Sequence, residues 1–283
     1  MTVAITGSEG FIGTHLQKKL ASESVDVIRI DFKLGYDLCN WDAVKSIPKF
    51  DVLVHFAGKS YVPDSYKDPR QFYEVNIQGT LNALELCRMH SARMVFTSSY
   101  VYGQPDYLPI DEKHPLKPFN PYAQSKIIGE QLCESYHRDF NTDVVVVRPF
   151  NIFGHGQRED FLIPKIINQA LSGKVELFDP KPRRDFIYIN DVMDAYYKII
   201  KLDKNTFDVI NLGSGVSYPV EEIANTIVNL FPDKISISYN NEQRANEVND
   251  TIADISHAKN VLNWEPKYNL RSGLADYIKK ILS

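Results

Sequence analysis

A tyrosine and a lysine four residues apart, Tyr122 and Lys126, are the pair of side chains in this sequence best suited to chemistry. Residues at this spacing share one face of a helix, so both polar groups can approach the same substrate atom. A free phenol has a pKa of about 10 and is a poor acid or base at neutral pH. We expect the lysine ammonium to favour the phenolate and to lower the pKa of Tyr122 toward the working range.

A glycine-rich turn near the N-terminus offers a place for a dinucleotide. The apolar, β-prone run Val3–Thr6 predicts a buried strand that leads into Gly7-x-x-Gly10-x-x-Gly13 and then into a helical pattern. Strand, glycine turn and helix together set backbone N–H groups and a helix N-terminus against a pyrophosphate. The spacing differs from G-x-G-x-x-G, but the flanking elements still predict a nucleotide-binding turn.

A second predicted strand, Val25–Ile30, ends at Asp31. A carboxylate roughly 20 residues past the glycines can accept hydrogen bonds from the adenosine ribose. It would also repel a 2′-phosphate, which favours NAD(H). Because Lys33 and Arg29 lie close enough to weaken that preference, both NAD(H) and NADP(H) remain open.

Length and composition indicate a soluble enzyme. A chain of 283 residues that is 43% hydrophobic can bury one large core, or one core and a lobe. A net charge of −4 gives no reason to expect a nucleic acid or an anionic membrane as partner. No apolar run is long enough for a signal or membrane segment. The three cysteines are widely spaced, which predicts reduced thiols in the cytoplasm and no metal site.

Strand and helix patterns alternate through the first half of the chain, which predicts an α/β fold with a doubly wound parallel (Rossmann) sheet. We predict a dinucleotide-binding domain over residues 1–152, with part of the later chain returning to it, and a smaller, mixed α/β substrate lobe over residues 153–283. Further strands are predicted at 51–55, 93–97 and 144–147. Helices are predicted at 40–46, 69–90, 121–140, 161–171, 191–202, 220–230 and 270–281.

Two later strands end in residues that suit a reaction site. The run Thr97-Ser98-Ser99 places hydroxyls where they can hydrogen-bond an oxygen held by Tyr122. The run His55-Phe56-Ala57-Gly58 has small residues that let a dinucleotide lie against the backbone. We interpret His55 itself as a packed core histidine.

Nine motifs occur in the order seen in extended short-chain dehydrogenases/reductases, and on them the sequence resembles the NDP-sugar epimerases, dehydratases and reductases over essentially its whole length. The motifs are the glycine turn, His55-Phe56-Ala57-Gly58, Asn76-Ile77-Gln78-Gly79-Thr80, Thr97-Ser98-x-x-Val101-Tyr102-Gly103, Tyr122-x-x-x-Lys126, Arg148-Pro149-Phe150-Asn151-Ile152-Phe153-Gly154, Arg184-Asp185-Phe186-Ile187-Tyr188, Asn211-Leu212-Gly213-Ser214-Gly215 and Arg244.

The resemblance implies a role for each matching position. Ser98, Tyr122 and Lys126 would be catalytic: the serine polarises the reacting oxygen, the tyrosine moves its proton, and the lysine also holds the nicotinamide ribose. Cofactor binding is implied for Gly7, Gly10, Phe11, Ile12, Gly13, Asp31, Lys33, Asp37, Leu38, Phe56, Ala57, Gly58, Asn76, Tyr122, Lys126 and Pro149. Substrate binding is implied for Ser60, Ser98, Ser99, Tyr122, Asn151, Arg184 and Arg244, where an arginine fork matches the phosphates of a nucleotide-diphosphate sugar.

The two residues after the catalytic serine narrow the reaction type. Dehydratases of this family usually carry an acidic pair there, and Ser99 and Tyr100 cannot replace it, which argues against 4,6-dehydration. The short path from Asp31 to Asp37 and the unusual stretch 156–161 favour a reductase acting on a dTDP- or GDP-linked 4-keto-6-deoxyhexose. A UDP-hexose 4-epimerase with the same three residues is the alternative, and a non-catalytic dinucleotide-binding scaffold is a remote one.

The predicted helices 69–90 and 121–140 resemble those through which this family forms dimers. We therefore expect a homodimer. Apolar positions such as Leu86 and Leu132 are compatible with such an interface, although core packing explains them equally well.

Overall fold

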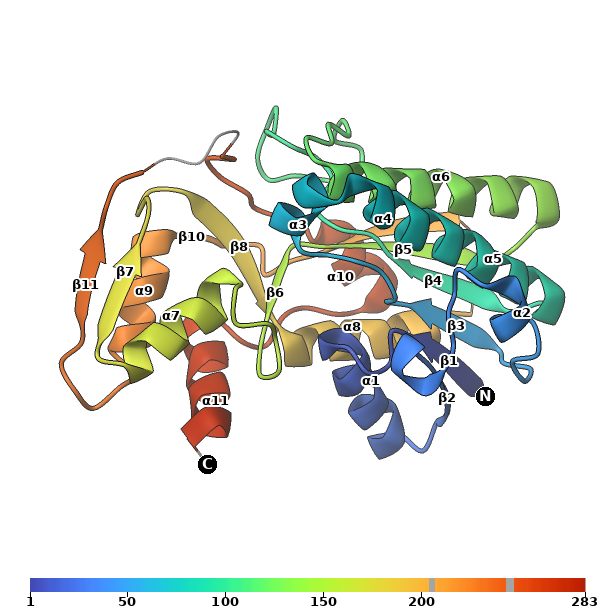
Figure 1. The fold of residues 1–283 in the computed structure, drawn as a ribbon, viewed down its shortest axis with the longest axis horizontal. Coiled ribbons are helices and arrows are strands. Elements are labelled where there is room, and N and C mark those ends of the chain that lie inside the picture. Colours follow the sequence, from blue (N-terminus) through green and yellow to red (C-terminus); the bar gives the residue numbers. More distant parts are fainter. Residues whose placement is uncertain (204–206, 243–246, 283) are drawn as a thin grey trace. The chain divides into compact units, whose positions relative to one another are not determined.

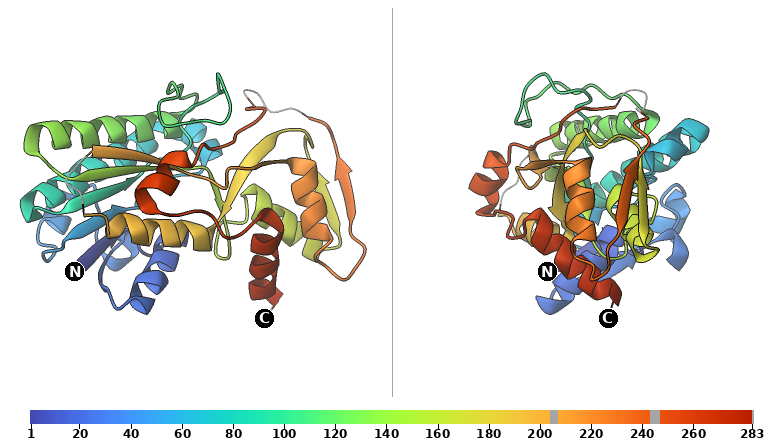
Figure 2. Two further views of the ribbon diagram at one scale, coloured as in Figure 1. Left: turned by 180° about the vertical axis from the view of Figure 1, so that it is seen from behind. Right: turned by 90° about the vertical axis from the view of Figure 1, so that its left-hand side faces the viewer.

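The structure is a computed structural model that describes residues 1–203, 207–242 and 247–282. Contacts divide the chain into two compact units (Figures 1 and 2). Unit 1 contains residues 1–103, 116–149 and 193–210, and unit 2 contains residues 104–115, 150–192 and 211–283. The chain therefore leaves unit 1 after Pro149 and returns to it for residues 193–210.

Unit 1 is built on a six-stranded sheet with the order β2-β1-β3-β4-β5-β9, to which β9 contributes its first residues. The pairings of β1 with β2 and β3, of β3 with β4, and of β4 with β5 are all parallel, which confirms the predicted α/β class. The strands are β1 (Thr2–Thr6), β2 (Asp26–Ile30), β3 (Val52–His55), β4 (Arg93–Thr97), β5 (Val144–Pro149) and β9 (Phe207–Leu212).

Helices cover both faces of this sheet, with α1 and α8 on one side and α5 and α6 on the other (Figure 1). The helices are α1 (Phe11–Ser22), α2 (Trp41–Val44), α3 (Val62–Lys67), α4 (Pro69–Tyr73), α5 (Gly79–His90), α6 (Pro121–Phe140) and most of α8 (Ile189–Ile200). Leu86 and Cys133 pack with Phe96 in the core beneath α5 and α6. Leu86 is therefore a core residue, and of the two positions considered for an interface only Leu132 remains partly exposed.

The helix predicted over residues 69–90 is in fact α4, a π-helical turn (Glu74–Gln78) and α5. Such turns commonly occur where a helix serves a functional site. Here the turn carries Asn76, which is 3% exposed. Its side chain bonds the backbone of Lys59 and the hydroxyl of Ser125, so it ties the loop after β3 to α6.

The approach of α6 to the sheet depends on one glycine. A Cβ at Gly129 would lie 2.5 Å from the ring of Phe96 on β4. Because Gly129 has no side chain, the face of α6 that carries Lys126 can pack closely against the end of β4. The Lys126 ammonium lies 5.1 Å from the centre of the Phe96 ring.

Unit 2 contains a three-stranded sheet, β10-β8-β6, and a two-stranded sheet, β11-β7. The strands are β6 (Asn151–Phe153), β7 (Lys174–Leu177), β8 (Arg183–Tyr188), β10 (Ser217–Pro219) and β11 (Ser236–Tyr239), and the helices are α7 (Leu162–Leu171), α9 (Val220–Val228), α10 (Ser256–Leu262) and α11 (Leu270–Leu282). The sequence predicts short strands in this lobe but not their positions, and it does not predict α10, because elements of three to seven residues show little periodicity. In the described ranges no helix is both long and apolar enough to cross a membrane.

Candidate functional site

The glycine turn between β1 and α1 has the shape that its sequence predicts. Gly7 has a φ of +66°, and a Cβ there would lie 2.8 Å from the backbone nitrogen of Ala57. A Cβ at Gly13 would overlap the Gly7 carbonyl oxygen and lie 2.8 Å from the Cα of Ser8. Gly10 is the N-cap of α1 and offers no side chain there. The turn therefore leaves the helix N-terminus open to an anion, which fits a pyrophosphate.

Asp31 lies beside this turn. One of its carboxylate oxygens accepts a hydrogen bond from the Glu9 backbone at 3.0 Å, and the other accepts one from the Lys33 backbone at 2.9 Å. The Lys33 side chain is exposed, and Arg29 lies 3.6 Å from the Glu9 carboxylate. The carboxylate is thus fixed at the end of β2, where the sequence predicts the adenosine ribose.

Gly58, Asn76 and Lys126 converge at the ends of β3 and β4. A Cβ at Gly58 would lie 2.8 Å from the Asn76 amide oxygen and 3.9 Å from the Lys126 ammonium. Since the Asn76 side chain bonds both the Lys59 backbone and the Ser125 hydroxyl, its first role is to shape this loop. Lys126 is 6% exposed and donates to the Thr97 carbonyl at 2.8 Å.

The expected effect of Lys126 on Tyr122 is not what the structure shows. Burial raises the pKa of the Tyr122 phenol, and the contribution that lowers it is a hydrogen bond with the Ser99 hydroxyl. Burial also lowers the pKa of Lys126 to about 8. The expectation failed because it counted the charge of the ammonium and left out the cost of burying a phenolate.

The two serines at the end of β4 have different partners. Ser98 is 2% exposed and donates to the Glu130 carboxylate at 2.5 Å. Ser99 is half-buried and bonds the Tyr122 phenol. The Ser98 hydroxyl is thus engaged by Glu130, whereas the Ser99 hydroxyl meets the phenol, so this geometry favours Ser99 over Ser98 as the hydroxyl that faces the substrate oxygen.

His55 is a structural residue, as expected. Its ring nitrogens bond the hydroxyls of Thr6 at 2.7 Å and Thr80 at 3.2 Å, and its side chain is buried. Burial, followed by the charge of Lys126, lowers the pKa of His55 to about 3.

The buried imidazole predicts acid sensitivity. Between pH 6.5 and about 3 the unfolded state binds a proton that the folded state does not, so the free energy of unfolding falls as the pH falls through this window. The contribution is at most about 1.4 kcal/mol per pH unit. Urea unfolding at pH 7 and pH 5 should show a smaller loss of stability for His55→Gln than for the wild type. Equal losses would contradict the assignment.

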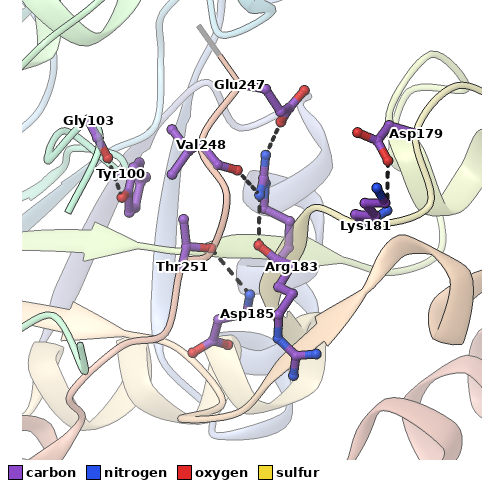
Figure 3. A network of polar contacts seen from close by, with 10 residues as sticks. Tyr100, Gly103, Asp179, Lys181, Arg183, Asp185, Glu247, Val248 and Thr251 are labelled. Carbon is purple, nitrogen blue, oxygen red and sulfur yellow. Dashed lines mark hydrogen bonds and ion pairs between the residues drawn. The ribbon is translucent and has the colours of Figure 1, made fainter. Parts of the chain in front are cut away.

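Two predicted phosphate ligands lie in unit 2, and both have protein partners. Asn151 donates to the Asp185 carbonyl at 2.9 Å. Arg184 donates to the Val248 carbonyl at 2.6 Å and forms an ion pair with Glu247. Figure 3 labels these two partners, Val248 and Glu247. A phosphate at Arg184 would therefore have to share the guanidinium with this carboxylate or displace it. Arg244 lies outside the described residues.

The Arg-Asp-Phe and Asn-Leu-Gly-Ser-Gly motifs meet at one buried carboxylate. Asp185 accepts hydrogen bonds from the backbone N–H groups of Ser214 at 2.7 Å, Gly215 at 3.0 Å and Ala253 at 3.1 Å. A Cβ at Gly213 would lie 2.7 Å from the same carboxylate. These motif positions therefore hold unit 2 together.

The remaining predicted residues lie near the ends of β1, β2, β3 and β5. Phe11 and Ile12 form the first turn of α1, Phe56 and Ala57 are half-buried after β3, and Ser60 is exposed in the next loop. Asp37 accepts from the Cys39 backbone, the Leu38 carbonyl accepts from Asn82, and Pro149 is buried at the end of β5. Within the described residues, no three His, Cys, Asp or Glu side chains gather as metal ligands.

A comparison with protein families decides where the chain belongs. Residues 3–213 match the NAD dependent epimerase/dehydratase family. The chain is a member of this family. It is therefore an NAD(P)-dependent enzyme, and the glycine turn has the open shape that a dinucleotide pyrophosphate needs.

Relatives within the family have different reactions. The chain is 30% identical to a putative UDP-glucose 4-epimerase of Methanocaldococcus jannaschii, covering 96% of this chain and 95% of the relative. It is also 30% identical to GDP-6-deoxy-D-mannose reductase of Pseudomonas aeruginosa, covering 98% and 97%. Overall identity therefore does not separate epimerase from reductase.

Solved structures agree on the fold and differ in cofactor. RMD from Pseudomonas aeruginosa, complexed with NADPH, superposes with a TM-score of 0.89 at 28% identity over 99% of each chain. UDP-glucuronic acid 4-epimerase from Bacillus cereus, complexed with UDP-glucuronic acid and NAD, superposes with a TM-score of 0.88 at 27% identity over 99% and 100%.

Three residues around the site were missed from the sequence. Glu130 and Arg148 form a buried ion pair behind Ser98, and Ser125 holds Asn76. A signal for Glu130 was present, since it follows Tyr122 and Lys126 at the same four-residue interval on one helix face. Nothing in the sequence pairs it with Arg148.

Proposed function

We propose that this family member reduces a dTDP- or GDP-linked 4-keto-6-deoxyhexose at C4. The observation that carries the proposal is the short path from Asp31 to Asp37, the feature that favoured a reductase from the sequence, which the structure spans with a single 3₁₀ turn, Phe32–Leu34. Burial also raises the pKa of the Tyr122 phenol, which favours the protonated form that a reductase needs. An epimerase begins with an oxidation and needs the same phenol as a base. The P. aeruginosa reductase is a relative with a reductase activity that is similar over nearly its full length. Because a putative epimerase matches equally well, identity by itself does not carry the choice.

The proposed chemistry is a balanced hydride and proton transfer. When bound, NAD(P)H supplies the hydride to the sugar carbon. Tyr122 donates its proton to the sugar oxygen as negative charge develops there, and solvent later restores the proton. Ser99 donates a hydrogen bond to the same oxygen. The Lys126 ammonium, which donates to the Thr97 carbonyl at 2.8 Å, would hold the nicotinamide ribose.

The experiment incubates the protein with dTDP- and GDP-4-keto-6-deoxyhexoses and NADH or NADPH, and follows absorbance at 340 nm. Stoichiometric oxidation of the cofactor supports the reductase. The 4-epimerase is the second candidate, favoured by the M. jannaschii relative. It would interconvert C4 epimers of a UDP-hexose without net consumption of cofactor, and that result would replace the proposal.

The two serines of β4 give a prediction that depends on their partners. Ser99→Ala should lower kcat by about 10²–10³-fold, the usual cost of removing one donor to a developing oxyanion. Ser98→Ala should lower it by about tenfold or less, because its hydroxyl is bonded to Glu130. Steady-state kinetics at neutral pH compares the two variants. A larger loss for Ser98→Ala would return the catalytic role to Ser98.

We also propose that the protein is a homodimer acting in the cytoplasm, where its three free cysteines would remain reduced. Support for the dimer comes from the family resemblance of α5 and α6 and from the exposed Met89 and Phe140 at their ends. Light scattering at micromolar concentration should give twice the 32.4 kDa of one chain. A monomer at that concentration would contradict the dimer.

A further inference from the structure

A buried ion pair lies directly behind the end of β4. Glu130 is 7% exposed and Arg148 is 5% exposed. The Arg148 guanidinium binds both carboxylate oxygens of Glu130: Nη2 donates to Oε2 at 2.6 Å, and Nε donates to Oε1 at 3.0 Å. Its Nη1 donates to the hydroxyl of the fully buried Tyr102 at 3.1 Å. The carboxylate is therefore held in one orientation.

The carboxylate accepts a third hydrogen bond, and the donor of this bond is next to the reaction site. Ser98 donates its hydroxyl to Glu130 at 2.5 Å, while its backbone N–H donates to the Val147 carbonyl at 2.8 Å. The residue before it supplies the carbonyl that accepts the Lys126 ammonium at 2.8 Å. The residue after it, Ser99, bonds the Tyr122 phenol. Fixing Ser98 thus fixes both of its neighbours.

Stability alone does not explain this ion pair. Moving two charges out of water carries a desolvation cost that their attraction offsets only when the geometry is good, and an apolar pair of similar volume often serves a core equally well. What an apolar pair cannot do is accept the Ser98 hydrogen bond. The property specific to Glu130 and Arg148 is the link to the end of β4.

We propose that Glu130, held by Arg148, is a positioning residue: through Ser98 it sets the Thr97 carbonyl against Lys126 and the Ser99 hydroxyl against Tyr122. The kinetic test of this proposal rests on the proposed function. The structural test rests only on the contacts described above. Misplacing a reacting group by about 1 Å can cost on the order of 10²-fold in rate, so a partial loss of this support should be measurable.

The charge of Glu130 also reaches Lys126. Burial lowers the pKa of Lys126 to about 8, and Glu130 and Cys133 on the same helix oppose that shift. The other titratable group that interacts with the ammonium is His55 on β3, whose lowered pKa keeps it neutral. The charge of Arg148 is paired with that of Glu130. Removing only the carboxylate charge should lower the pKa of Lys126 further, so the ammonium would be lost at a lower pH.

The test compares the wild type with Ser98→Ala, the double variant Glu130→Met/Arg148→Met, and the triple variant that combines them. The double variant preserves volume and leaves no unpaired charge in the core. We expect Ser98→Ala and the double variant each to lower kcat about tenfold with KM within threefold, and the triple variant to lose no more than either, because all remove the same link. Glu134→Gln, an exposed change on the same helix, should match the wild type.

If the effects of Ser98→Ala and of the double variant are independent, kcat will be about a hundredfold lower in the triple variant, and this would overturn the proposal. A double variant with wild-type kcat would also overturn it. If the double variant does not fold, Glu130→Gln gives the second readout. Its kcat should fall at a lower alkaline pH than that of the wild type, and an unchanged alkaline limb would contradict the charge argument.

Failure of the proposed function is a different result. If the wild type turns over no nucleotide sugar, crystal structures of Ser98→Ala and the double variant still test the inference. We expect the Ser99 hydroxyl to be displaced relative to the Tyr122 phenol in both. An unmoved Ser99 would overturn the positioning role whatever the substrate is.

Discussion

Replacing Tyr122 by phenylalanine should lower kcat by about 10²–10⁴-fold, the range expected when a positioned general acid is removed. The change removes one oxygen from a side chain whose ring is already packed against α4, where the Phe72 ring lies 6.4 Å away. Cofactor binding should persist, because the glycine turn and Asp31 are untouched. Steady-state kinetics and fluorescence titration with NADH measure the two quantities.

The matched control is Tyr136→Phe, the same change on the same helix. The Tyr136 hydroxyl lies 3.3 Å from the Glu85 carboxylate and belongs to no part of the proposed site. We expect wild-type kcat for this variant. If Tyr122→Phe also retains wild-type turnover, the reaction does not pass through this phenol. Under the scaffold hypothesis the wild type would have no turnover to lose, and both changes would leave NADH binding unaffected.

The second large effect is expected at Gly13. A Cβ at this position would overlap the Gly7 carbonyl oxygen and lie 2.8 Å from the Cα of Ser8, and backbone atoms cannot move aside without reshaping the turn. Gly13→Ala should therefore raise the Kd for NADH by about 10–100-fold, equivalent to about 1.4–2.8 kcal/mol of binding free energy. Fluorescence titration or calorimetry provides the measurement.

Alanine substitutions at two other glycines should change the Kd for NADH by smaller amounts. At Gly10 a Cβ would lie 3.1 Å from the same Gly7 oxygen, which predicts a smaller rise in Kd. At Gly79 the nearest atom would be 3.6 Å away, in ordinary contact, so Gly79→Ala should leave the Kd unchanged. Equal effects at all three positions would indicate a general loss of folding, which thermal unfolding of each variant would detect.

Much of unit 1 could be predicted because its signals are local. The apolar strands, the helix α6 and the glycine turn each depend on residues adjacent in sequence, and the structure has them within a few residues of the predicted bounds. The predicted helix 69–90 was wrong in one respect, since a π-helical turn interrupts it at Glu74–Gln78. That turn depends on bonds from Asn76 to Lys59 and Ser125, which lie far from it in the sequence.

The fold class and the family could be read from the amino-acid sequence alone, and with them the presence of a tyrosine and a lysine on one helix face near a nucleotide-binding turn. Periodicity and motif order are enough for these. The tertiary structure was needed to show which serine contacts Tyr122 and in which direction the pKa of the phenol is shifted. It was also needed to show that the ion pair of Glu130 and Arg148 lies next to Ser98. The reason is that burial and long-range pairing set hydrogen-bond partners and pKa values, and neither is written in the spacing of residues along the chain.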